Sequence, residues 1–552
     1  MKGVTAVANI LKMEGNEYLF CFPANPLINE AATAGIRPII ARTERGAINM
    51  ADGYSRIKGG GHFGVVATQG GPGIENGFGA VAHAFADSIP LLVLPGGTNR
   101  SRQGVRPDFS APLNYQHVTK WTAELNMADR VPEMMRYAYM NMRTGRPGPV
   151  VLEIPGDVMN EEIDEVKFNY RPVKGKKSAG DPQDAAEVVK MLLAAKAPVL
   201  HVGQGVHDCE AWAELREFAE LVNAPVMTIT TGKSAFPEDH PLSIGNGGNT
   251  ATGMVDHFLK KADLVFGIGS SFYVSLVGTP VPQGKTMVQC TYDERDLSNE
   301  YPLDGAVLGD VKLVLQQLIA EVKKQAGPNG RKGNAAIANE VKAVKDAWLM
   351  QWMPKLTSAE RPINPYRVVW DLMNTLDRRN TIITHDSGNP RDQMTPFFQP
   401  LIPHGYIGWG NSTQLGYSLG ISIGAKLAAP EKTVVHMLGD AAIGMAGFDF
   451  ETAVRSSAPI ITVVLNNGRM GGYDRNMPSA TERYGSNLLG GNYSKMAESL
   501  GVVGERVEDP NQVAPAIKRA MEANKQGRSV LLEMMTRQER DFSRVSWVGG
   551  GH

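Results

Sequence analysis

Two polar residues in the last third of the chain follow strand-like runs and could together bind a divalent cation. The run TVVHMLG ends at Gly439 and is followed by Asp440, and the run PIITVVLN is followed by Asn467. A helix-length segment connects the two runs, so both residues are expected at the carboxyl edge of one parallel sheet. The Asp440 carboxylate, the Asn467 amide oxygen and the Arg469 carbonyl would offer three of the oxygen ligands that Mg²⁺ prefers, and a diphosphate would add two.

The turn after Asp440 has the character of a diphosphate site. The amides of Ala441 and Ala442 lie where the strand turns into a helix, and a helix N-terminus attracts anions. A Gly-Asp pair after a strand is by itself more often a turn or a helix cap. Its pairing with Asn467, 27 residues later, resembles the Gly-Asp-Gly…Asn-Asn signature of thiamine-diphosphate-dependent enzymes. Ala441 departs from that signature, but alanine is the smallest change from glycine and keeps the same amide.

A second part of the resemblance lies near the N-terminus, in the sequence ARTERGAINMADGYSRIKG. In isolation, Glu44 would be interpreted as a charge at the start of a helix. The segment resembles the family's Glu…Ala-x-Gly-Tyr-Ala-Arg block, which implies that Glu44 bonds the pyrimidine ring of the cofactor. A carboxylate at that position shares a proton with the ring nitrogen and promotes the imino form, which can then deprotonate thiazolium C2. The resemblance therefore implies that Glu44 is the catalytic residue.

The resemblance assigns further residues to the cofactor site. The block THDSGNPRD resembles a diphosphate-binding turn, and VVATQGGPGIENGF resembles a tight turn near the cofactor. In GWGNSTQLGYSLG, backbone atoms of Thr413 and Leu415 are implied to hold the aminopyrimidine, while the Leu415 side chain lies under the cofactor and bends it. The implied cofactor-binding residues are Glu44, Gly73, Asn76, Ser387, Gly388, Asn389, Thr413, Leu415, Gly439, Asp440, Ala441, Ala442 and Asn467.

Four residues are candidates for a substrate pocket, namely Asn25, Gln69, Met470 and Tyr473. Asn25 and Gln69 stand where relatives place substrate-facing side chains, and the other two lie in a glycine-rich segment that could form a lid. Decarboxylases of the benzoylformate and pyruvate kinds often have a histidine near the position of Gln69. Because glutamine cannot act as an acid or base at neutral pH, the sequence argues against a simple aldehyde-releasing decarboxylase.

The elements that must position these residues alternate between strand-like and helix-length segments. Runs such as GVVATQ, PVLHVGQG and TIITHDSG are continuously apolar and end in glycine or polar residues, which is typical of parallel strands buried on both faces. Two segments, at 164–182 and 323–335, are rich in charge, Pro and Gly and are predicted to be linkers. We therefore predict three doubly wound parallel-sheet α/β domains, a pyrimidine-binding domain at 1–165, a middle domain at 180–325 and a diphosphate-binding domain at 350–537, followed by a tail at 538–552.

Composition limits the location and the partners of the chain. The 56 basic and 57 acidic residues give a formal net charge of −1, so no overall field draws the chain to nucleic acid or to an anionic membrane. Cys21, Cys209 and Cys290 are too scattered for a disulfide framework or a CxxC metal site. The N-terminal segment carries Glu14 and Glu17 where a signal peptide needs apolar residues, and no apolar run is long enough to span a bilayer. We predict a cytoplasmic protein without nucleic-acid or membrane partners.

The whole pattern, up to about residue 537, resembles the acetolactate-synthase-like group of thiamine-diphosphate-dependent enzymes. The resemblance implies a lyase or carboligase that uses thiamine diphosphate and Mg²⁺ on a small-molecule 2-keto acid, 2-hydroxy ketone, aldehyde or acyl-CoA. Because Glu44 and the metal ligands fall in different domains, it also implies a site shared by two subunits, hence a homodimer at minimum, with a homotetramer the more frequent assembly. The middle domain lacks a complete G-x-G-x-x-G motif, and neither FAD nor an ADP-containing ligand is expected there.

Two alternatives stay open. One is a 2-hydroxyacyl-CoA lyase or an oxalyl-CoA-decarboxylase-like enzyme, whose signs would be a basic adenine-nucleotide pocket in the middle domain and an ordered C-terminal lid. The other is a catalytically inactive, cofactor-binding regulatory subunit, suggested by Ala441 and by the missing histidine, although Glu44 speaks against it. The tail at 538–552 is either a frayed terminus or a segment that closes over a site.

Overall fold

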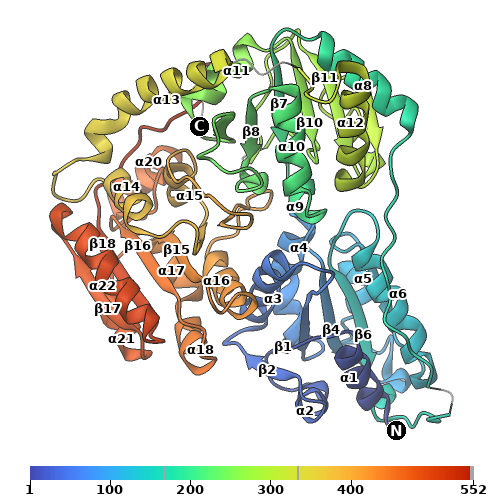
Figure 1. The fold of residues 1–552 in the computed structure, drawn as a ribbon. Helices are drawn as coiled ribbons and strands as arrows, with labels where there is room; N and C mark the ends of the chain where they lie inside the picture. Colours follow the sequence, from blue (N-terminus) through green and yellow to red (C-terminus); the bar gives the residue numbers. More distant parts are fainter. Residues whose placement is uncertain (167, 276, 332–334, 548–552) are drawn as a thin grey trace.

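Three six-stranded parallel sheets, each surrounded by helices, organise the chain (Figure 1). The computed structural model describes residues 1–166, 168–275, 277–331 and 335–547. Every pairing between the strands described there is parallel, so helical crossovers connect the strands of each sheet. The predicted fold class, three doubly wound α/β domains, is confirmed.

The first sheet has the strand order β2-β1-β3-β4-β6-β5. Its strands are β1 Tyr18–Cys21, β2 Arg37–Ile40, β3 Gly64–Thr68, β4 Leu91–Gly97, β5 Trp121–Glu124 and β6 Val150–Pro155. Its helices are α1 Gly3–Met13, α2 Leu27–Thr33, α3 Glu44–Lys58, α4 Pro72–Ala86, α5 Ala111–Tyr115, α6 Val131–Arg143 and α7 Gly156–Asn160. Strands β3 and β6 are buried along their whole length, as expected for parallel strands covered on both faces.

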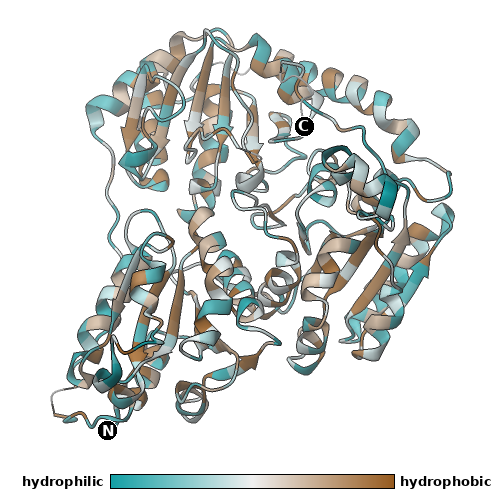
Figure 2. Cartoon of the chain, turned by 180° about the vertical axis from the view of Figure 1, so that it is seen from behind, coloured by the Kyte–Doolittle hydropathy of each residue, from teal (hydrophilic) through white to brown (hydrophobic). Residues whose placement is uncertain are grey.

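The second sheet has the order β12-β11-β10-β7-β8-β9. Its strands are β7 Pro198–Val202, β8 Val226–Ile229, β9 Ser243–Gly247, β10 Leu264–Ile268, β11 Thr286–Thr291 and β12 Gly305–Leu308. Its helices are α8 Pro182–Ala194, α9 Gly205–Asp208, α10 Trp212–Val222, α11 Gly253–Lys261 and α12 Val311–Ala326. Figure 2 shows apolar residues concentrated along the strands of the sheets, while the helices carry a mixture of polar and apolar residues.

The third sheet has the order β14-β13-β15-β16-β18-β17. Its strands are β13 Thr381–His385, β14 Tyr406–Ile407, β15 Thr433–Gly439, β16 Ile461–Asn466, β17 Val503–Val507 and β18 Val530–Met535. Its helices are α14 Pro365–Thr375, α15 Asn389–Met394, α16 Tyr417–Ala428, α17 Asp440–Ala446, α18 Asp449–Arg455, α19 Tyr473–Asn476, α20 Pro478–Tyr484, α21 Tyr493–Ser499 and α22 Val513–Lys525.

Helix α13, Ala335–Leu356, connects the second and third sheets and packs on both. Trp348 in this helix lies against Gly253 of α11 and stacks on Phe397, with ring centroids 4.9 Å apart. The predicted linker at 323–335 therefore overlaps the ends of two helices, although 332–334 lie outside the described residues. The predicted linker at 164–182 holds no regular helix or strand in its described residues before Pro182.

The described part of the C-terminal tail is packed rather than frayed. Tyr366 donates its hydroxyl to the carbonyl of Asp541, and Ser543 bonds both Trp348 and the carbonyl of Ala251. Trp547 donates its indole N–H to Pro280 in the second domain. The tail thus straps the third domain to the second as far as residue 547, and residues 548–552 lie outside the described part. Within the described residues, no helix is long and apolar enough to cross a membrane.

Helices α3 and α16 join the first and third domains through unusually close contact. A Cβ on Gly53 would lie 2.1 Å from the carbonyl oxygen of Ile421, and one on Gly424 would lie 1.9 Å from that of Met50. Neither distance is possible, so the two helix backbones can approach this closely only at glycine. One hydrophobic core cluster accordingly continues from α3 of the first domain into α16 of the third.

We expect Gly424→Ala to destabilise the chain by about 1–3 kcal/mol, because an added methyl group must force these helices apart. Gly444→Ala is a matched control: Gly444 also lies in a helix, but a Cβ there meets no atom within 4 Å. Replacing a helical glycine in open space should stabilise by roughly 0.5–1 kcal/mol. Urea unfolding of the two apo-proteins measures both effects, and equal midpoints would contradict the contact argument.

Candidate functional site

The ends of β15 and β16 bring the predicted cation ligands together. The two strands are neighbours, with Gly439 opposite Leu465, so Asp440 and Asn467 emerge side by side at one sheet edge. Both side chains accept a hydrogen bond from the backbone N–H of Arg469, at 3.2 Å from the Asp440 carboxylate and 3.0 Å from the Asn467 amide oxygen. The strand spacing in the sequence therefore predicted a real juxtaposition.

Asp440 is a buried carboxylate with no ion-pair partner among the described residues. Its side chain is 4% exposed. Burial raises the pKa of Asp440, and hydrogen bonds from backbone amides, including those of Arg469 and Ala441, oppose the shift only in part. A buried anion of this kind favours a bound cation, and the nearby amide and carbonyl oxygens suit Mg²⁺. The donor set therefore fits the metal that the sequence predicts.

Clusters of three or more His, Cys, Asp or Glu side chains that could hold a metal are absent from the described residues. That absence does not bear on this site, because its donors are one carboxylate, one amide and one backbone carbonyl. Hard cations that bind phosphates are commonly held by only one or two protein carboxylates.

Glu533, which the sequence reasoning missed, orients this edge from the neighbouring strand β18. It is fully buried and accepts hydrogen bonds from Asn466 Nδ2 at 2.8 Å and from the N–H of Ser494 at 3.0 Å. The Asn466 amide oxygen in turn accepts from the N–H of Gly468 at 3.0 Å. The chain after β16 is thereby turned so that Asn467 points to Asp440. A single acidic residue inside the apolar run VLLEMM was the available signal.

The turn at 387–389 lies at the end of the adjacent strand β13. Ser387 and Asn389 are partly exposed, and a Cβ on Gly388, whose φ is +81°, would meet no atom within 4 Å. Space for a ligand is therefore present directly over the turn. A Cβ on Gly471, just beyond Asn467, would approach Asn389 Nδ2 to 2.7 Å, so the two predicted parts of the site are neighbours.

Asp386, also missed by the sequence reasoning, joins this turn to the segment at 413–416. It is fully buried, and its carboxylate accepts from the N–H groups of Ser387 at 2.9 Å, Gly416 at 3.1 Å and Ser418 at 3.1 Å. The Ser418 hydroxyl donates to it at 2.7 Å. Thr413 is exposed and Leu415 is half-buried, which leaves both within reach of a ligand.

Glu44 begins α3 and is held in a defined orientation. The Thr43 side chain caps the helix by accepting the N–H of Gly46, and the Glu44 side chain is 7% exposed. Asn76 donates its amide to the Glu44 carboxylate at 2.7 Å. A Cβ on Gly73 would lie 3.2 Å from the same carboxylate, so glycine leaves room for it. Gly73 and Asn76, predicted to bind cofactor, thus directly surround Glu44.

The four predicted substrate-pocket residues do not form one pocket within the chain. The Asn25 amide is committed to the protein, because it donates to the carbonyls of Thr68 and Leu94 and accepts from the N–H of Leu27. Gln69 is exposed at the end of β3, beside a cavity of about 400 Å³ lined largely by glycine. Met470 and Tyr473 belong instead to a part of the third domain beyond β16.

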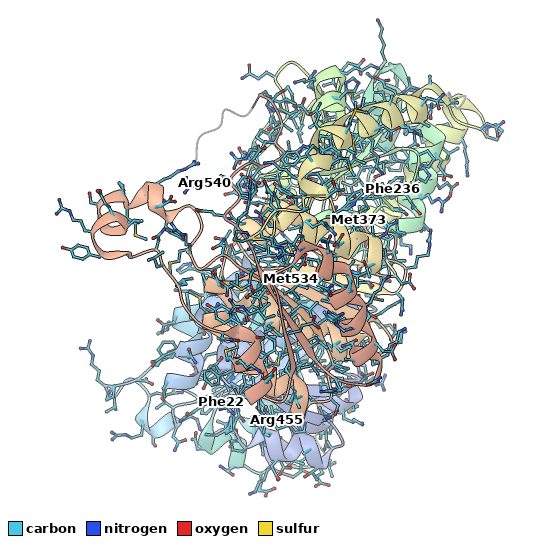
Figure 3. All side chains as sticks on the ribbon, turned by 90° about the vertical axis from the view of Figure 1, so that its left-hand side faces the viewer. Phe22, Phe236, Met373, Arg455, Met534 and Arg540 are labelled. Atoms are coloured by element: carbon cyan, nitrogen blue, oxygen red, sulfur yellow. The ribbon has the colours of Figure 1, made fainter. Side chains whose placement is uncertain are left out.

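Helices α19 and α20 project from the body of the third domain. Figure 3 shows this projection beside Arg540, which pairs with Asp474, and well apart from the first-domain strand end marked by Phe22. Tyr473 is 48% exposed there. Asn25 and Gln69 therefore belong to a different domain edge from Met470 and Tyr473, and the shared substrate pocket of these four residues stays a prediction.

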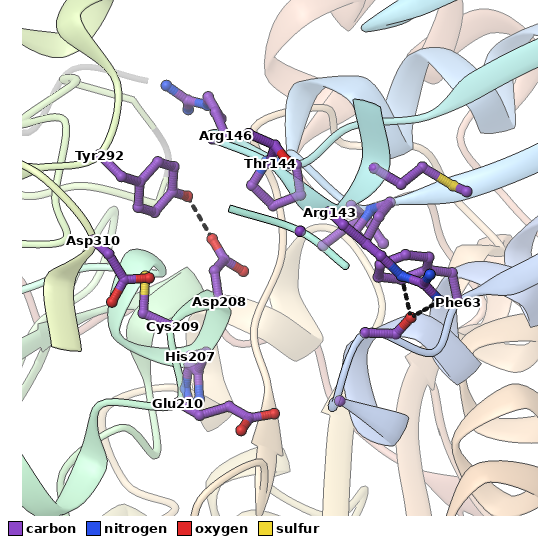
Figure 4. A pocket seen from close by; sticks show the side chains of 18 of the residues that line it. Phe63, Arg143, Thr144, Arg146, His207, Asp208, Cys209, Glu210, Tyr292 and Asp310 are labelled. Carbon is purple, nitrogen blue, oxygen red and sulfur yellow. Dashed lines mark hydrogen bonds between the residues drawn. The ribbon is translucent and has the colours of Figure 1, made fainter. Parts of the chain in front are cut away.

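A larger cavity of about 1020 Å³ lies where the three domains meet (Figure 4). It contains none of the predicted cofactor-binding residues, and its lining includes Lys120, Arg143, Arg146, Lys174, Lys176 and Lys177. Burial lowers the pKa of Lys120 to about 8. On the opposite wall, Tyr292 donates to Asp208 at 2.6 Å, and burial raises the pKa of Asp208 to about 6. Although several of these basic groups pair with acids, the lining is basic overall.

Three models of one protein family match the chain in succession. They are the N-terminal TPP binding domain of thiamine pyrophosphate enzymes at residues 1–126, the central domain at 185–318, and the C-terminal TPP binding domain at 386–534. The probable acetolactate synthase large subunit of Methanocaldococcus jannaschii is 29% identical over 95% of this chain and 90% of the relative. The acetolactate synthase isozyme 3 large subunit of Escherichia coli K12 is 25% identical over 100% and 97%, and the glyoxylate carboligase of Escherichia coli O157:H7 is 29% identical over 97% and 94%.

We expect Asp440→Asn to raise the melting temperature of the metal-free protein at pH 7. The folded-state pKa of Asp440 is raised, so its ionisation costs stability as pH rises from the unfolded pKa through the folded one, and asparagine removes that cost. The variant should also lose the extra stabilisation that Mg²⁺ with thiamine diphosphate gives the parent protein. Thermal melts with and without both ligands measure the two effects.

Asp449→Asn is the matched control for this experiment. Asp449 is equally buried at 4% exposure, and burial likewise raises its pKa, but it bonds the N–H of Arg42 and the hydroxyl of Thr452. Its replacement should leave the ligand response intact. An Asp440→Asn protein that is still stabilised as strongly as the parent would remove Asp440 from the metal site.

Proposed function

The chain belongs to the thiamine-pyrophosphate-dependent enzymes of the acetolactate-synthase-like family, and on that premise we propose that it is a carboligase or lyase acting on a 2-keto acid or 2-hydroxy ketone. The observation that carries the proposal is the buried Asp440 carboxylate, which has no ion-pair partner among the described residues and lies beside Asn467 at the same sheet edge as the open turn at 387–389. This arrangement offers one place for a divalent cation and a diphosphate together.

In the proposed site the third domain binds the charged end of the cofactor. Asp440, Asn467 and the carbonyl of Arg469 hold Mg²⁺, while the amides of Ala441 and Ala442 and the turn after Asp386 receive the diphosphate. The Ala441 N–H donates a hydrogen bond to the Asp440 carboxylate at 3.0 Å. An amide at the start of α17 therefore binds a negatively charged group in the structure. When bound, thiamine diphosphate supplies a nucleophilic carbon and an electron sink for the bond that is made or broken.

Glu44 holds and moves a proton at the pyrimidine ring nitrogen. Its contact with Asn76 leaves the carboxylate few orientations, so the proton is delivered to one position rather than to solvent. Gln69, at the open end of β3, cannot donate a proton in the way a histidine can. We therefore propose that carbon–carbon bond formation is favoured over protonation and release of an aldehyde.

We further propose that two chains share each site. Glu44, Asn25 and Gln69 then meet the cofactor of the partner subunit, whose projecting segment brings Met470 and Tyr473. Apolar side chains exposed near both half-sites support this arrangement, including Phe78 at 38% and Leu113 at 70% in the first domain and Met445 at 54% and Phe448 at 65% in the third. A second chain would cover them, and a homodimer, assembled further into a tetramer, is the proposed form.

Glu44→Gln should lower kcat by roughly 10²–10⁴-fold, the range for loss of a general acid or base. Binding of thiamine diphosphate, followed by calorimetry, should remain within a few-fold of the parent protein because the diphosphate site is untouched. Turnover is measured as CO₂ release and as carboligation with pyruvate, benzoylformate, glyoxylate and formyl-CoA. A parent protein that binds the cofactor but is inert with all four would favour the inactive regulatory subunit instead.

Co-expression of Glu44→Gln with Asp440→Ala chains tests the shared site. A mixed dimer carries one intact site, formed by Glu44 of one chain and Asp440 of the other, so random mixing should restore about a quarter of the parent activity. If each site lay within one chain, every site would keep one defect and mixing would restore nothing. Each variant expressed alone is the control.

The basic cavity between the three domains favours a second candidate, an acyl-CoA lyase of the 2-hydroxyacyl-CoA or oxalyl-CoA kind. A cavity of about 1020 Å³ lined by lysines and arginines suits a nucleoside diphosphate such as ADP. The C-terminal tail is also packed against the second domain as far as Trp547. Three lysines of the linker line the cavity, and one of them, Lys177, pairs with Asp310. Lys174 and Lys176 have no acidic partner among the described residues.

If this second candidate holds, ADP should bind to the parent protein, and Lys174→Glu with Lys176→Glu should weaken it roughly tenfold or more through two charge reversals. Lys342→Glu is the matched control, since Lys342 is 74% exposed on α13, outside the cavity. Isothermal calorimetry with ADP measures the affinity. Absence of ADP binding, with unchanged activity towards 2-keto acids, would leave the carboligase proposal alone.

A further inference from the structure

Arg45, the residue after Glu44, makes a contact that crosses from the first domain to the third. Its guanidinium donates a hydrogen bond to the backbone carbonyl of Leu415. Leu415 belongs to the segment proposed to support the aminopyrimidine, and Glu44 is the proposed proton-handling carboxylate. Two neighbouring residues at the start of α3 therefore face two different functional groups.

The segment that Arg45 contacts is otherwise weakly held. Across the part of the chain that the structure describes, the backbone of residues 412–415 makes no hydrogen bond to another backbone group. Its nearest backbone anchor on the C-terminal side is the N–H of Gly416, which bonds Asp386. On the other side, the N–H of Asn411 bonds Asp87 of the first domain. The bond to the Leu415 carbonyl is thus a direct restraint on the C-terminal end of the segment.

The surroundings of Arg45 strengthen this restraint. Burial lowers the pKa of Arg45, while the carboxylate of Asp386 acts in the opposite direction and favours the charged guanidinium. Asp386 itself holds the N–H groups of Ser387, Gly416 and Ser418. A charge-assisted bond in a partly buried setting is stronger than one at the surface. The arginine and the aspartate therefore fix the same segment from two sides.

A second first-domain helix supports the same segment. A Cβ on Gly79 of α4 would lie 2.5 Å from Gln414 Nε2, so the Gln414 amide rests directly on that helix. Gly79 is three residues after Asn76, which holds Glu44. The segment at 412–415 is consequently packed against the same two helices, α3 and α4, that orient the proposed catalytic carboxylate.

We infer that Arg45 is a positioning residue. It fixes the position of Leu415 relative to the bound cofactor and links the segment at 412–415 to the start of α3, which carries Glu44. This inference rests on the proposed function. In a dimer with shared sites, Glu44 serves the cofactor of the partner subunit while Arg45 secures the segment under the chain's own cofactor.

The experiment compares Arg45→Met and Arg45→Lys with the parent protein. Arg45→Met keeps an apolar stem but removes the donor, so the Kd for thiamine diphosphate should rise roughly 10- to 100-fold. The Kd for inorganic pyrophosphate with Mg²⁺ should stay unchanged, because pyrophosphate lacks the aminopyrimidine that Leu415 supports. Arg45→Lys keeps the charge and one donor and should recover part of the affinity. Calorimetry measures the Kd values of both ligands for the parent protein and the two variants. The induced circular dichroism of the bound cofactor reports its conformation.

Arg37→Met is the matched control. Arg37 also reaches from the first domain to a third-domain carbonyl, that of Ser456 at 2.9 Å, but neither residue is among those proposed to bind the cofactor or the metal. Both methionine variants lose one interdomain hydrogen bond, so any general loosening of the interface appears in both melting temperatures. Only Arg45→Met should change cofactor affinity and the circular dichroism of the bound cofactor.

The outcomes separate this inference from the proposed function. If Arg45→Met binds thiamine diphosphate as tightly as the parent protein and with the same circular dichroism, the inference is wrong while the proposed function stands. Equal weakening of pyrophosphate and thiamine diphosphate would also overturn it, because the defect would then lie in the diphosphate site. A parent protein that binds no thiamine diphosphate in the presence of Mg²⁺ would overturn both.

Discussion

The close crossing of α3 and α16 is the contact on which the candidate site depends. Gly53 and Gly424 let the two helix backbones touch, and this brings the start of α3 next to the segment that precedes α16. The first helix begins with Glu44 and the second follows Leu415. Within one chain, the spacing between the start of α3 and residue 415 is therefore set by two packed helices, so in the proposed dimer each chain places Glu44 for the partner's cofactor and Leu415 for its own in a fixed relation. A loop-borne site could not hold the two groups with comparable accuracy.

Two buried carboxylates near the site have different roles, although burial raises the pKa of both. Asp440 and Asp386 are both carboxylates whose pKa values burial raises, yet their hydrogen-bond partners differ. Asp386 is satisfied by backbone amides and the Ser418 hydroxyl and thus has a structural role. Asp440 accepts from the N–H groups of Arg469 and Ala441 and has no ion-pair partner among the described residues, so its carboxylate is the one suited to a cation. These amides offset the cost of burying Asp440 only in part, so a cation bound there would couple metal binding to stability.

The sequence allowed much of the fold and the centre of the site to be predicted, for physical reasons. Buried parallel strands are continuously apolar, so the strand ends carrying Asp440 and Asn467 could be located, and adjacent parallel strands necessarily end at one edge. The roles of Asp386, Glu533 and Arg45 could not be found in this way, because most of their partners are distant in sequence. The acidic residue inside VLLEMM marks Glu533 as unusual, but it does not identify the groups that Glu533 binds. Gly420 illustrates the same limit: a Cβ there would lie 2.5 Å from that of Asn49, a constraint visible only in three dimensions.

The placement of the pocket residues supports the proposal that two chains complete the site. Asn25 was predicted to face substrate, but its amide is used to join the ends of β3 and β4, so it shapes the wall next to Gln69 rather than offering a free donor. The first-domain edge therefore provides an open glycine-lined surface with few polar groups of its own. The third-domain edge provides the charge but leaves Met445 and Phe448 exposed beside it. Each edge lacks what the other supplies, and the apolar rim around the charged one stays in water until another surface covers it. In the proposed dimer, association of the two chains would remove that rim from water and exclude solvent from Glu44 and Asp440 at the same time, so the energy that assembles the dimer would also create the low-dielectric site that the proposed chemistry needs.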